Sequence, residues 1–473
     1  MKSMIMQHVP GPRTSPSAAE QDHQARSQTC GVVRTVLRVR TPALRTGPRT
    51  FPSAAETDHP SRFVNKTDHR VCLRARRPRS GPRRSLSALT TLALAGLLVA
   101  MPISQAQTAN WQGGDFGKRW NDAANWSPQV VPINGPGTNY TVIVPANSRI
   151  SYWDELTGTI GALILGDRSV LDIAEDSQLI VTNGFIRGTI QTDGPLSLFR
   201  ADGGYIELTA HPRFVARNWS RIEVGIGGYR SSGYDADTNL VVADTDAVVD
   251  LSTITSFAIE PGSGAITYSL SATEGGVIDL SQLDTLTGPG SDDWLRFLLT
   301  TGGNIRLDAL RTTEGRVRFD VRVPRFEWPR LETSADTEFL LSSNVIGSLP
   351  IAGTLQGGKV SLAAASSLDA PMLAKVTGTD FELANEATFI PPNLEEMDDV
   401  AVNLTGTGAF IATNLTAYRD SDIAVRPGRD FRSAPLTDVN RSRISVTDGI
   451  QYAVAATSYE VGEQWLPPSN PAG

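Results

Sequence analysis

The best set of candidate metal ligands in the sequence lies in and just after the loop at residues 227–239. Its members are Asp235, Asp237, Asn239 and Asp246. The first three alternate along the chain, which gathers oxygen atoms as calcium-binding loops do, and the fourth falls where such loops carry their twelfth-position ligand. The sixth position is Leu240, however, where a calcium loop needs glycine. A polar turn is therefore the favoured interpretation, and Ca²⁺ is the one cofactor that the sequence suggests.

A second candidate site is a series of arginines that would recognise the carboxylate or sulfate groups of a glycan. Its members are Arg306, Arg316, Arg318 and Arg322, and the series continues to Arg325 and Arg330. Guanidinium groups bind such anions through paired hydrogen bonds. Asp308, Asp320 and Glu327 are interleaved with the arginines, which favours an ordinary solvated face of mixed charge as the alternative.

Several tryptophans near residue 107 offer a possible sugar-stacking surface. They are Trp111, Trp120, Trp126 and Trp153. Large rings with one polar edge stack on sugars, but they also pack well together as a cap over the open end of a fold. We expect the packed cap.

Catalytic chemistry finds little support in residues 107–473. This segment has no cysteine and a single histidine, His211, which excludes zinc sites of the usual Cys and His kind and makes any serine triad depend on His211. His211 precedes a proline in an ordinary apolar context, which favours a structural role. Acidic pairs such as Asp292 with Asp293 suit hydrolysis by two carboxylates, but they are common in so acidic a segment. We predict no catalytic residue.

The charge distribution divides the chain near residue 106. Residues 1–106 hold 17 of the 43 basic residues and only 5 of the 50 acidic ones, a net charge of +12. Residues 107–473 hold the other 26 basic and 45 acidic residues, a net charge of −19. So large an asymmetry means that the two segments must be interpreted separately.

Residues 83–106 have the anatomy of a secretory signal peptide. Two arginines begin the segment, an apolar run follows, and the small residues Ser104 and Ala106 stand before the expected cleavage point. An uncleaved membrane anchor is the alternative. Residues 1–82 form a basic low-complexity leader, which we interpret as disordered or as a mis-assigned start. Its charge alone would permit nucleic acid binding, but an exported protein meets little nucleic acid, so we expect no nucleic acid partner.

Residues 316–323 show the clearest secondary-structure pattern in the chain. Val317, Phe319 and Val321 alternate with charged residues, as the two faces of a half-buried strand require. Similar short runs occur at 140–144, 205–208, 248–251, 277–280, 305–307 and 360–362. No long window has a convincing helical period, so we expect little helix.

A Gly-Gly-x-Ile-x-Leu unit, in varying completeness, recurs along the chain. It begins at Gly275, Gly302 and Gly357, with weaker versions at Gly203 and Val248. The first interval is about half of the second, which indicates one repeat step followed by two and hence a repeat architecture. One unit cannot bury its own apolar residues, so the units must stack, with glycine pairs where the backbone turns sharply.

The predicted fold is therefore all-β: a β-solenoid with an aromatic-rich N-terminal cap. We place the cap at residues 107–150, the solenoid repeats at 151–430, and a C-terminal strand with a disordered tail at 431–473. A β-sandwich or barrel is the alternative, but it explains only the short strands and not the recurring unit.

Two motifs carry a family resemblance. Trp111-Gln-Gly-Gly-Asp-Phe with Trp120-Asn-Asp-Ala-Ala-Asn-Trp, and the Gly-Gly-x-Ile-Asp-Leu-Ser-x-Leu unit, resemble exported autotransporter-like and planctomycete-type β-solenoid surface proteins. The resemblance implies a right-handed β-helix at the cell surface or in the medium, and it supplies no shared catalytic residue. A weaker similarity to receptor L-domains, through the x-Leu-x-x-Leu spacing, also implies a β-helix.

The functional expectation is an exported β-solenoid with a structural, adhesive or glycan-contacting role and no catalysis. Its expected partners are polysaccharides or components of the cell envelope, and the segment after residue 106 should have no membrane span. The alternative function is a polysaccharide lyase or hydrolase of β-helix type that acts on an acidic polysaccharide, an idea supported by fold analogy alone.

Overall fold

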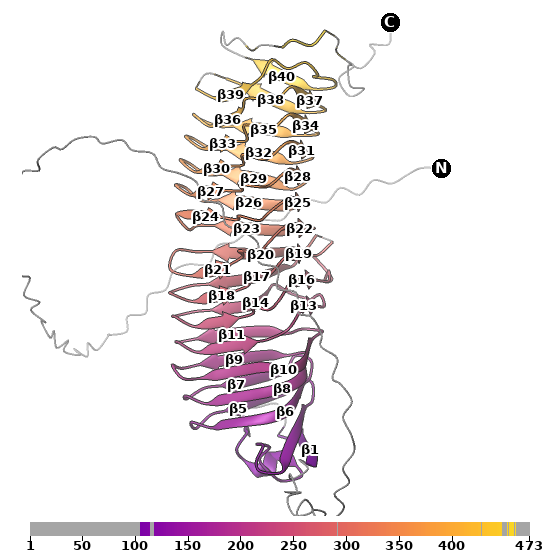
Figure 1. Cartoon of the computed structure of the whole chain (residues 1–473), viewed down its shortest axis with the longest axis vertical. Coiled ribbons are helices and arrows are strands. Elements are labelled where there is room, and N and C mark those ends of the chain that lie inside the picture. The colour runs from indigo at the N-terminus through magenta and orange to yellow at the C-terminus, as the bar shows by residue number, and fades with distance from the viewer. Residues whose placement is uncertain are drawn as a thin grey trace, which may run out of the picture. The chain divides into compact units, whose positions relative to one another are not determined.

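The computed structural model describes residues 105–113, 118–290, 292–426 and 428–446, together with residues 452, 454–457 and 459. The predicted leader at 1–82, nearly all of the predicted signal peptide and most of the predicted tail lie outside the described residues. The described chain coils into a β-helix whose walls are four parallel sheets (Figure 1). The all-β solenoid prediction is confirmed.

Sheet A forms the first part of one wall and has ten strands. In spatial order they are β3 (Trp126–Ser127), β1 (Gln105–Trp111), β4 (Thr138–Val144), β6 (Thr157–Leu165), β8 (Gln178–Ile186), β10 (Leu198–Leu208), β12 (Arg221–Val224), β15 (Val248–Asp250), β18 (Val277–Asp279) and β21 (Asn304–Arg306). Only the pairing of β1 with β3 is antiparallel among the named strands. The single 3₁₀ turn of the described chain, Ala123–Asn125, lies just before β3.

Sheet B forms the longest wall, with fifteen strands. They are β2 (Lys118–Arg119), β5 (Arg149–Tyr152), β7 (Val170–Ile173), β9 (Thr189–Asp193), β11 (Arg213–Arg217), β14 (Thr238–Ala243), β17 (Thr267–Ala272), β20 (Trp294–Leu299), β23 (Val317–Val321), β26 (Thr337–Leu341), β29 (Lys359–Leu362), β32 (Asp380–Leu383), β35 (Ala401–Leu404), β38 (Asp422–Val425) and β40 (Arg443–Val446). At about 4.8 Å per strand, this wall is on the order of 65 Å long.

Sheets C and D complete the coils. Sheet C contains β13 (Gly228–Ser231), β16 (Ser256–Ile259), β19 (Thr285–Thr287), β22 (Thr312–Glu314), β25 (Thr333–Ala335), β28 (Thr354–Gln356), β31 (Lys375–Thr377), β34 (Glu396–Asp398) and β37 (Ala417–Arg419). Sheet D contains β24 (Arg325–Glu327), β27 (Ile346–Ser348), β30 (Ser367–Asp369), β33 (Thr388–Ile390), β36 (Ala409–Ala412) and β39 (Asp430–Ser433).

The number of walls changes along the solenoid. From β4 to β11 the strands alternate between sheets A and B. From β12 onward a strand of sheet C lies between them, and from β24 onward sheet D takes the place of sheet A in the chain order. Parallel pairing already begins at β1, ahead of the predicted solenoid boundary at residue 151, and continues to β40.

The coil length also changes, which corrects the prediction of a single repeat period. In sheet A, the position that pairs with Val248 is Val277. In sheet D, Arg325 pairs with Ile346, which is a shorter advance along the chain, and every later pairing of that sheet repeats this shorter step. The interval between the second and third glycine pairs is therefore not two steps of one repeat, because the second pair leads into sheet A and the third into sheet B.

The glycine pairs nevertheless have the predicted physical role. Gly275 and Gly302 adopt φ angles of 87° and 89°, in the left-handed region that favours glycine. The second glycine of each pair lies against the coil before it: a Cβ on Gly303 would stand 2.0 Å from the carbonyl oxygen of Ala272. A positive φ angle and a close approach to the preceding coil are required at corners that lead into different walls. The glycine pair therefore marks a corner and not one particular wall.

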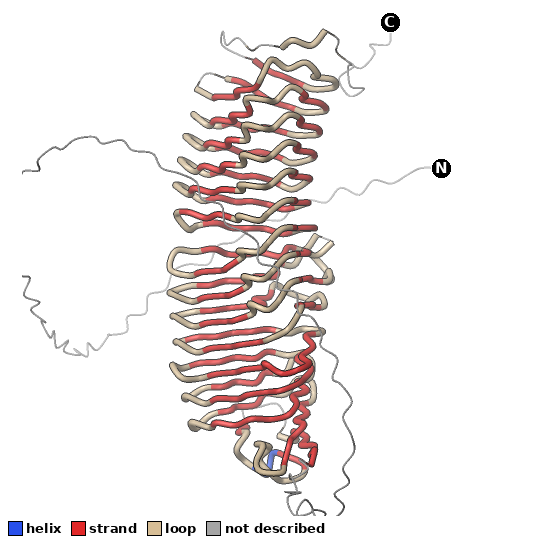
Figure 2. The backbone as a smooth tube through the Cα atoms, viewed as in Figure 1, coloured by secondary structure: helices blue, strands red, loops and turns tan. Residues whose placement is uncertain are grey.

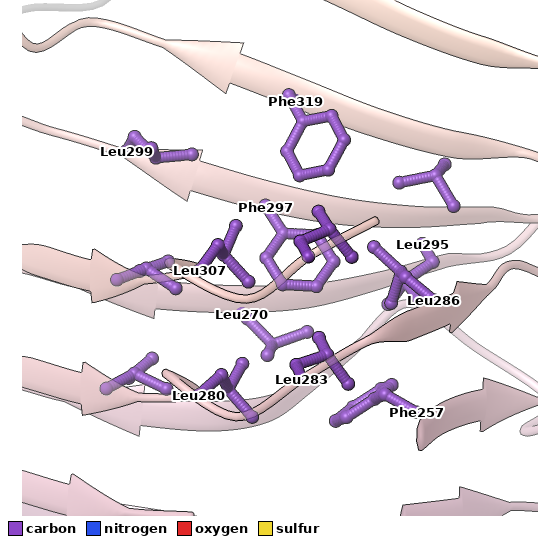
Figure 3. Close-up of a cluster of buried hydrophobic side chains, with 14 of the residues drawn as sticks. Phe257, Leu270, Leu280, Leu283, Leu286, Leu295, Phe297, Leu299, Leu307 and Phe319 are labelled. Atoms are coloured by element: carbon purple, nitrogen blue, oxygen red, sulfur yellow. The ribbon is translucent and has the colours of Figure 1, made fainter. Parts of the chain in front are cut away.

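The core fills the interior of the coils. Strand β23 shows the predicted alternation, with Val317, Phe319 and Val321 fully buried. Figure 3 shows how Phe319, Phe297 and leucines from neighbouring coils stack in columns inside the walls. Each coil of a solenoid contacts only its neighbours, so the apolar side chains of every coil must be buried against the adjacent coils. Burial of these side chains supplies most of the stability of the fold.

An aromatic cluster closes the N-terminal end of the core, as expected. Trp126 packs edge-on against both Trp111 and Trp120, with ring centroids 4.9 and 4.8 Å apart, and Trp120 contacts Tyr152 at 5.2 Å. All four rings are buried. The three tryptophans are therefore packed together and do not form a sugar-stacking surface, whereas the fourth predicted tryptophan, Trp153, is half-buried. Within the part of the chain that the structure describes, no helix is long and apolar enough to cross a membrane.

Two leucine substitutions test the position of the core. Leu295→Ala removes a fully buried side chain between the walls, and we expect it to lower the free energy of unfolding by about 2–5 kcal/mol. Leu196→Ala makes the same change at a turn residue that is 62% exposed, and should change stability by less than about 0.5 kcal/mol. Urea unfolding followed by circular dichroism measures both. Equal losses would contradict this assignment of the core.

Candidate functional site

The longer coils owe their extra residues to loops at one corner, between sheet C and sheet B. Residues 232–237, 260–266 and 288–293 connect β13 to β14, β16 to β17 and β19 to β20. In the next coils the same connection is only residues 315–316 and 336. We call the three long connections the loop corner; they are among the tan loops of Figure 2 at the place where Figure 1 labels β13, β16 and β19. In repeat proteins, such insertions gather on one face, which is often the binding face.

Carboxylates of the first and third loops bind backbone groups at the second loop, in the coil between them. The Asp237 Oδ1 atom accepts a hydrogen bond from the backbone N–H of Thr267 at 2.7 Å. Asp293 is fully buried and accepts the N–H groups of Gly262 and Ile266, at 2.6 and 2.8 Å. A carboxylate that accepts backbone N–H groups makes strong hydrogen bonds, so these aspartates hold the loops in place.

The predicted calcium ligands have other partners and do not converge. The Asp235 carboxylate pairs with Arg168 at 3.1 Å, and the backbone oxygen of Asn239 accepts a hydrogen bond from Arg213. Asp246 lies beyond β14, in the turn before β15. Nowhere in the described residues do three or more Asp, Glu, His or Cys side chains form a group that could hold a metal ion. The structure thus places Asp235 and Asp237 in a polar turn and leaves Asp246 apart from it.

The predicted arginine series is divided between two walls. Arg316 and Arg318 lie together at the start of β23 in sheet B, and Arg322 follows the end of that strand. Arg306 instead lies in β21 of sheet A, beside a hollow of about 310 Å³ where sheet A ends and sheet D begins. The chain passes from sheet A to sheet B between Arg306 and Arg322. Residues that are close in sequence can therefore lie on different walls, which the sequence pattern did not reveal.

Each of these arginines is paired with a carboxylate. The pairs are Arg306 with Asp279 (2.9 Å), Arg316 with Asp292 (3.3 Å), Arg318 with Glu338 (2.6 Å) and Arg322 with Asp320 (2.9 Å). Register explains two of these pairs, since Arg318 lies directly opposite Glu338, and Arg306 opposite Asp279, on adjacent strands. The arginines therefore form a charge-balanced lattice and not a bare cationic ladder.

Asp320 is the most enclosed carboxylate of this lattice. Burial raises the pKa of its carboxyl, but hydrogen bonds from Arg322 and Arg296, and the charges of both guanidinium groups, outweigh burial and leave the pKa below its usual value. Asp320 therefore remains ionised and joins two strands of sheet B, since Arg296 lies on β20 and Asp320 on β23.

Trp294 adds an aromatic ring to this part of sheet B. The guanidinium carbons of Arg318 and Arg316 lie 4.3 and 5.2 Å from its ring centroid. The ring borders a hollow of about 420 Å³, which we call the Trp294 hollow, lined also by Arg316, Glu338, Lys359 and Asp380. Sequence analysis missed Trp294 and Lys359; the signal for Trp294 was its outward position in the alternating strand Trp294–Leu299.

His211 lies at the same edge of sheet B, at the beginning of β11. Its Nδ1 atom is 2.5 Å from a carboxylate oxygen of Asp167, and its Nε2 atom is 3.2 Å from the backbone oxygen of Gly233. Both ring nitrogens thus face protein atoms. This arrangement ties His211 to the loop at 232–237 and suits a supporting role.

Known proteins do not extend these observations. No protein-family model matches the chain, no curated protein is significantly similar to it in sequence, and no solved structure matches its fold significantly. The loop corner and the neighbouring face of sheet B are the parts of the molecule from which a function can be inferred.

The lowered pKa of Asp320 makes a testable prediction about stability. Asp320→Asn should cost about 1 kcal/mol at neutral pH, a modest value because the pairs remain in contact with solvent. The pKa is lower in the folded chain, so the charge stabilises the fold above the unfolded pKa of about 3.9, and that stabilisation disappears as the pH falls through the folded value.

Urea unfolding at a series of pH values measures this effect. The difference between wild type and Asp320→Asn should shrink steadily below about pH 4. Asp308→Asn is the matched control, since Asp308 is exposed and has no ion pair within the described chain. If the difference in unfolding free energy between wild type and Asp320→Asn stayed constant into strong acid, Asp320 would act through its shape and not through its charge.

Proposed function

We propose that this protein is an exported, non-catalytic β-solenoid that contacts acidic polysaccharide through the loop corner and the adjoining face of sheet B. The observation that carries the proposal is the Trp294 hollow. There the Trp294 ring, the Arg316 guanidinium, the Lys359 ammonium group and three carboxylates line one hollow at the edge of sheet B, and the Arg318 guanidinium lies against the Trp294 ring. The predicted signal peptide and the resemblance to surface solenoids support export and a location on the cell surface or in the medium.

The chemistry of the hollow suits a sugar chain. Sugar rings present C–H groups to aromatic surfaces and hydroxyl groups to charged side chains. Arg316 and Lys359 would donate hydrogen bonds to hydroxyl or carboxylate oxygens, whereas Glu338 and Asp380 would accept them from hydroxyl groups. Gly290, which also lines the hollow, adds no side chain to it, and a Cβ at this position would meet no atom within 4 Å.

The surrounding structure suits a scaffold better than an enzyme. The basic side chains at and beside the hollow are all ion-paired: Arg318 with Glu338, Arg316 with Asp292, and Lys359 with Glu382 at 2.8 Å. Paired groups hold a fixed surface and are poorly placed to exchange protons with a substrate. The proposed role is therefore adhesive or structural, with the lattice keeping the binding face rigid.

Trp294→Ala tests the proposed contact. The probes are polygalacturonate and neutral dextran, with binding measured by affinity electrophoresis. We expect wild-type protein to be retarded by polygalacturonate, and Trp294→Ala to bind about tenfold more weakly because the stacking surface is lost. Trp219→Ala is the matched control: Trp219 is 54% exposed but lies in the turn between β11 and β12, at another corner.

The same incubation distinguishes binding from turnover. We expect no new sugar ends and no unsaturated products after prolonged incubation of polygalacturonate with the protein. Release of either product would favour the lyase or hydrolase alternative. Equal binding by Trp294→Ala and wild type would contradict the assignment of the contact to the Trp294 hollow.

A further inference from the structure

A second hollow lies at the same edge of sheet B, under the first loop of the loop corner. It occupies about 320 Å³ where β7, β9, β11 and β14 begin, and we call it the Arg213 pocket. Its lining includes Val170, Thr189, Arg213, Tyr234 and Thr238. The volume is at the lower end of the range for small-molecule sites in proteins.

The roof of this pocket is built from residues 232–237. Arg168 reaches across to Asp235 at 3.1 Å, His211 Nε2 contacts the backbone oxygen of Gly233, and the backbone N–H of Tyr234 donates to the Tyr268 hydroxyl at 3.1 Å. The loop is thus attached at three consecutive residues to three different coils. A roof held in this way preserves the shape of the pocket in the absence of a ligand.

Arg213 supplies an oriented cation to the pocket. Its Nε–H donates to the backbone oxygen of Asn239 at 2.9 Å, which fixes the plane of the guanidinium group. Within the described chain it forms no ion pair, unlike the predicted arginines of sheets A and B. Its two terminal nitrogens therefore keep their capacity for a bidentate contact with a carboxylate.

Tyr234 completes one side of the pocket. Its side chain lines the pocket and its ring contacts the His211 ring, with ring centroids 4.5 Å apart, whereas its hydroxyl oxygen is buried away from solvent. Burial raises the pKa of this hydroxyl above its usual value, so it keeps its proton.

We infer that the Arg213 pocket binds the carboxylate of a single sugar-acid unit. The Arg213 guanidinium is the donor for the carboxylate. Thr189, Thr238 and the Asp235 carboxylate, which also line the pocket, are placed to meet ring hydroxyl groups. The choice of a sugar acid over another small carboxylate depends on the proposed function, whereas the carboxylate contact depends only on the pocket.

The position of the pocket favours a polymer that occupies both hollows. Arg213 is on β11 and Trp294 on β20, and the order of sheet B places three strand spacings between them. That separation is about 14 Å along the solenoid axis, within the length of a short oligosaccharide. An acidic chain that runs along this edge would place one unit in each hollow.

Isothermal titration calorimetry with galacturonate tests the inference, and galactose is the neutral probe. We expect wild type to bind galacturonate, and Arg213→Gln to bind it at least tenfold more weakly. Arg230→Gln is the matched control, because Arg230 is exposed on β13 of sheet C and does not line the Arg213 pocket, and it should bind as wild type does. Galactose should bind at least tenfold more weakly than galacturonate.

Unchanged galacturonate affinity in Arg213→Gln, or no binding by wild type, would overturn the inference.

These results separate this inference from the proposed function. If polygalacturonate binding depends on Trp294 but galacturonate binding is absent or independent of Arg213, only the carboxylate pocket is wrong. If galacturonate binds through Arg213 but the polymer is not retained, the pocket stands and the polysaccharide contact is wrong.

Discussion

The structure depends on one interaction, the parallel backbone hydrogen-bond ladder that joins each coil to the next. In sheet B it continues through fifteen strands, and it satisfies the backbone polar groups that burial would otherwise leave without partners. The ladder also fixes register, and register determines which side chains meet on the outer face. Arg318 faces Glu338 because β23 pairs with β26 in one way only.

The change in coil length arises at the corners, where the longer coils carry inserted loops. The shorter coils that contain sheet D have short corners, and their left-handed turn positions recur at Asp336, Gly357, Gly378, Asp399 and Asp420. The longer coils keep the same ladder but insert loops between sheets C and B. Because a loop at a corner does not interrupt the ladder, a solenoid can acquire a binding surface there with little loss of stability.

Much of the fold could be predicted from the sequence, but little of the candidate site could. Alternation at Val317, Phe319 and Val321 predicts a buried strand because the period-two pattern is local. The partners of Asp237 and Asp293 are backbone groups in a neighbouring coil, far away along the sequence, so the alternating aspartates resembled a calcium loop. Likewise, the neutralisation of Arg318 depends on cross-strand register, which neighbouring residues in the sequence do not reveal.

Hydrogen–deuterium exchange with and without polygalacturonate tests the central claim that the loop corner and the adjoining edge of sheet B form the binding surface. The account predicts that the polymer slows exchange in residues 232–237, 260–266 and 288–293 and where β11, β20 and β23 begin, while sheet D is unchanged. Protection confined to sheets A or D, or no protection despite binding, would contradict it.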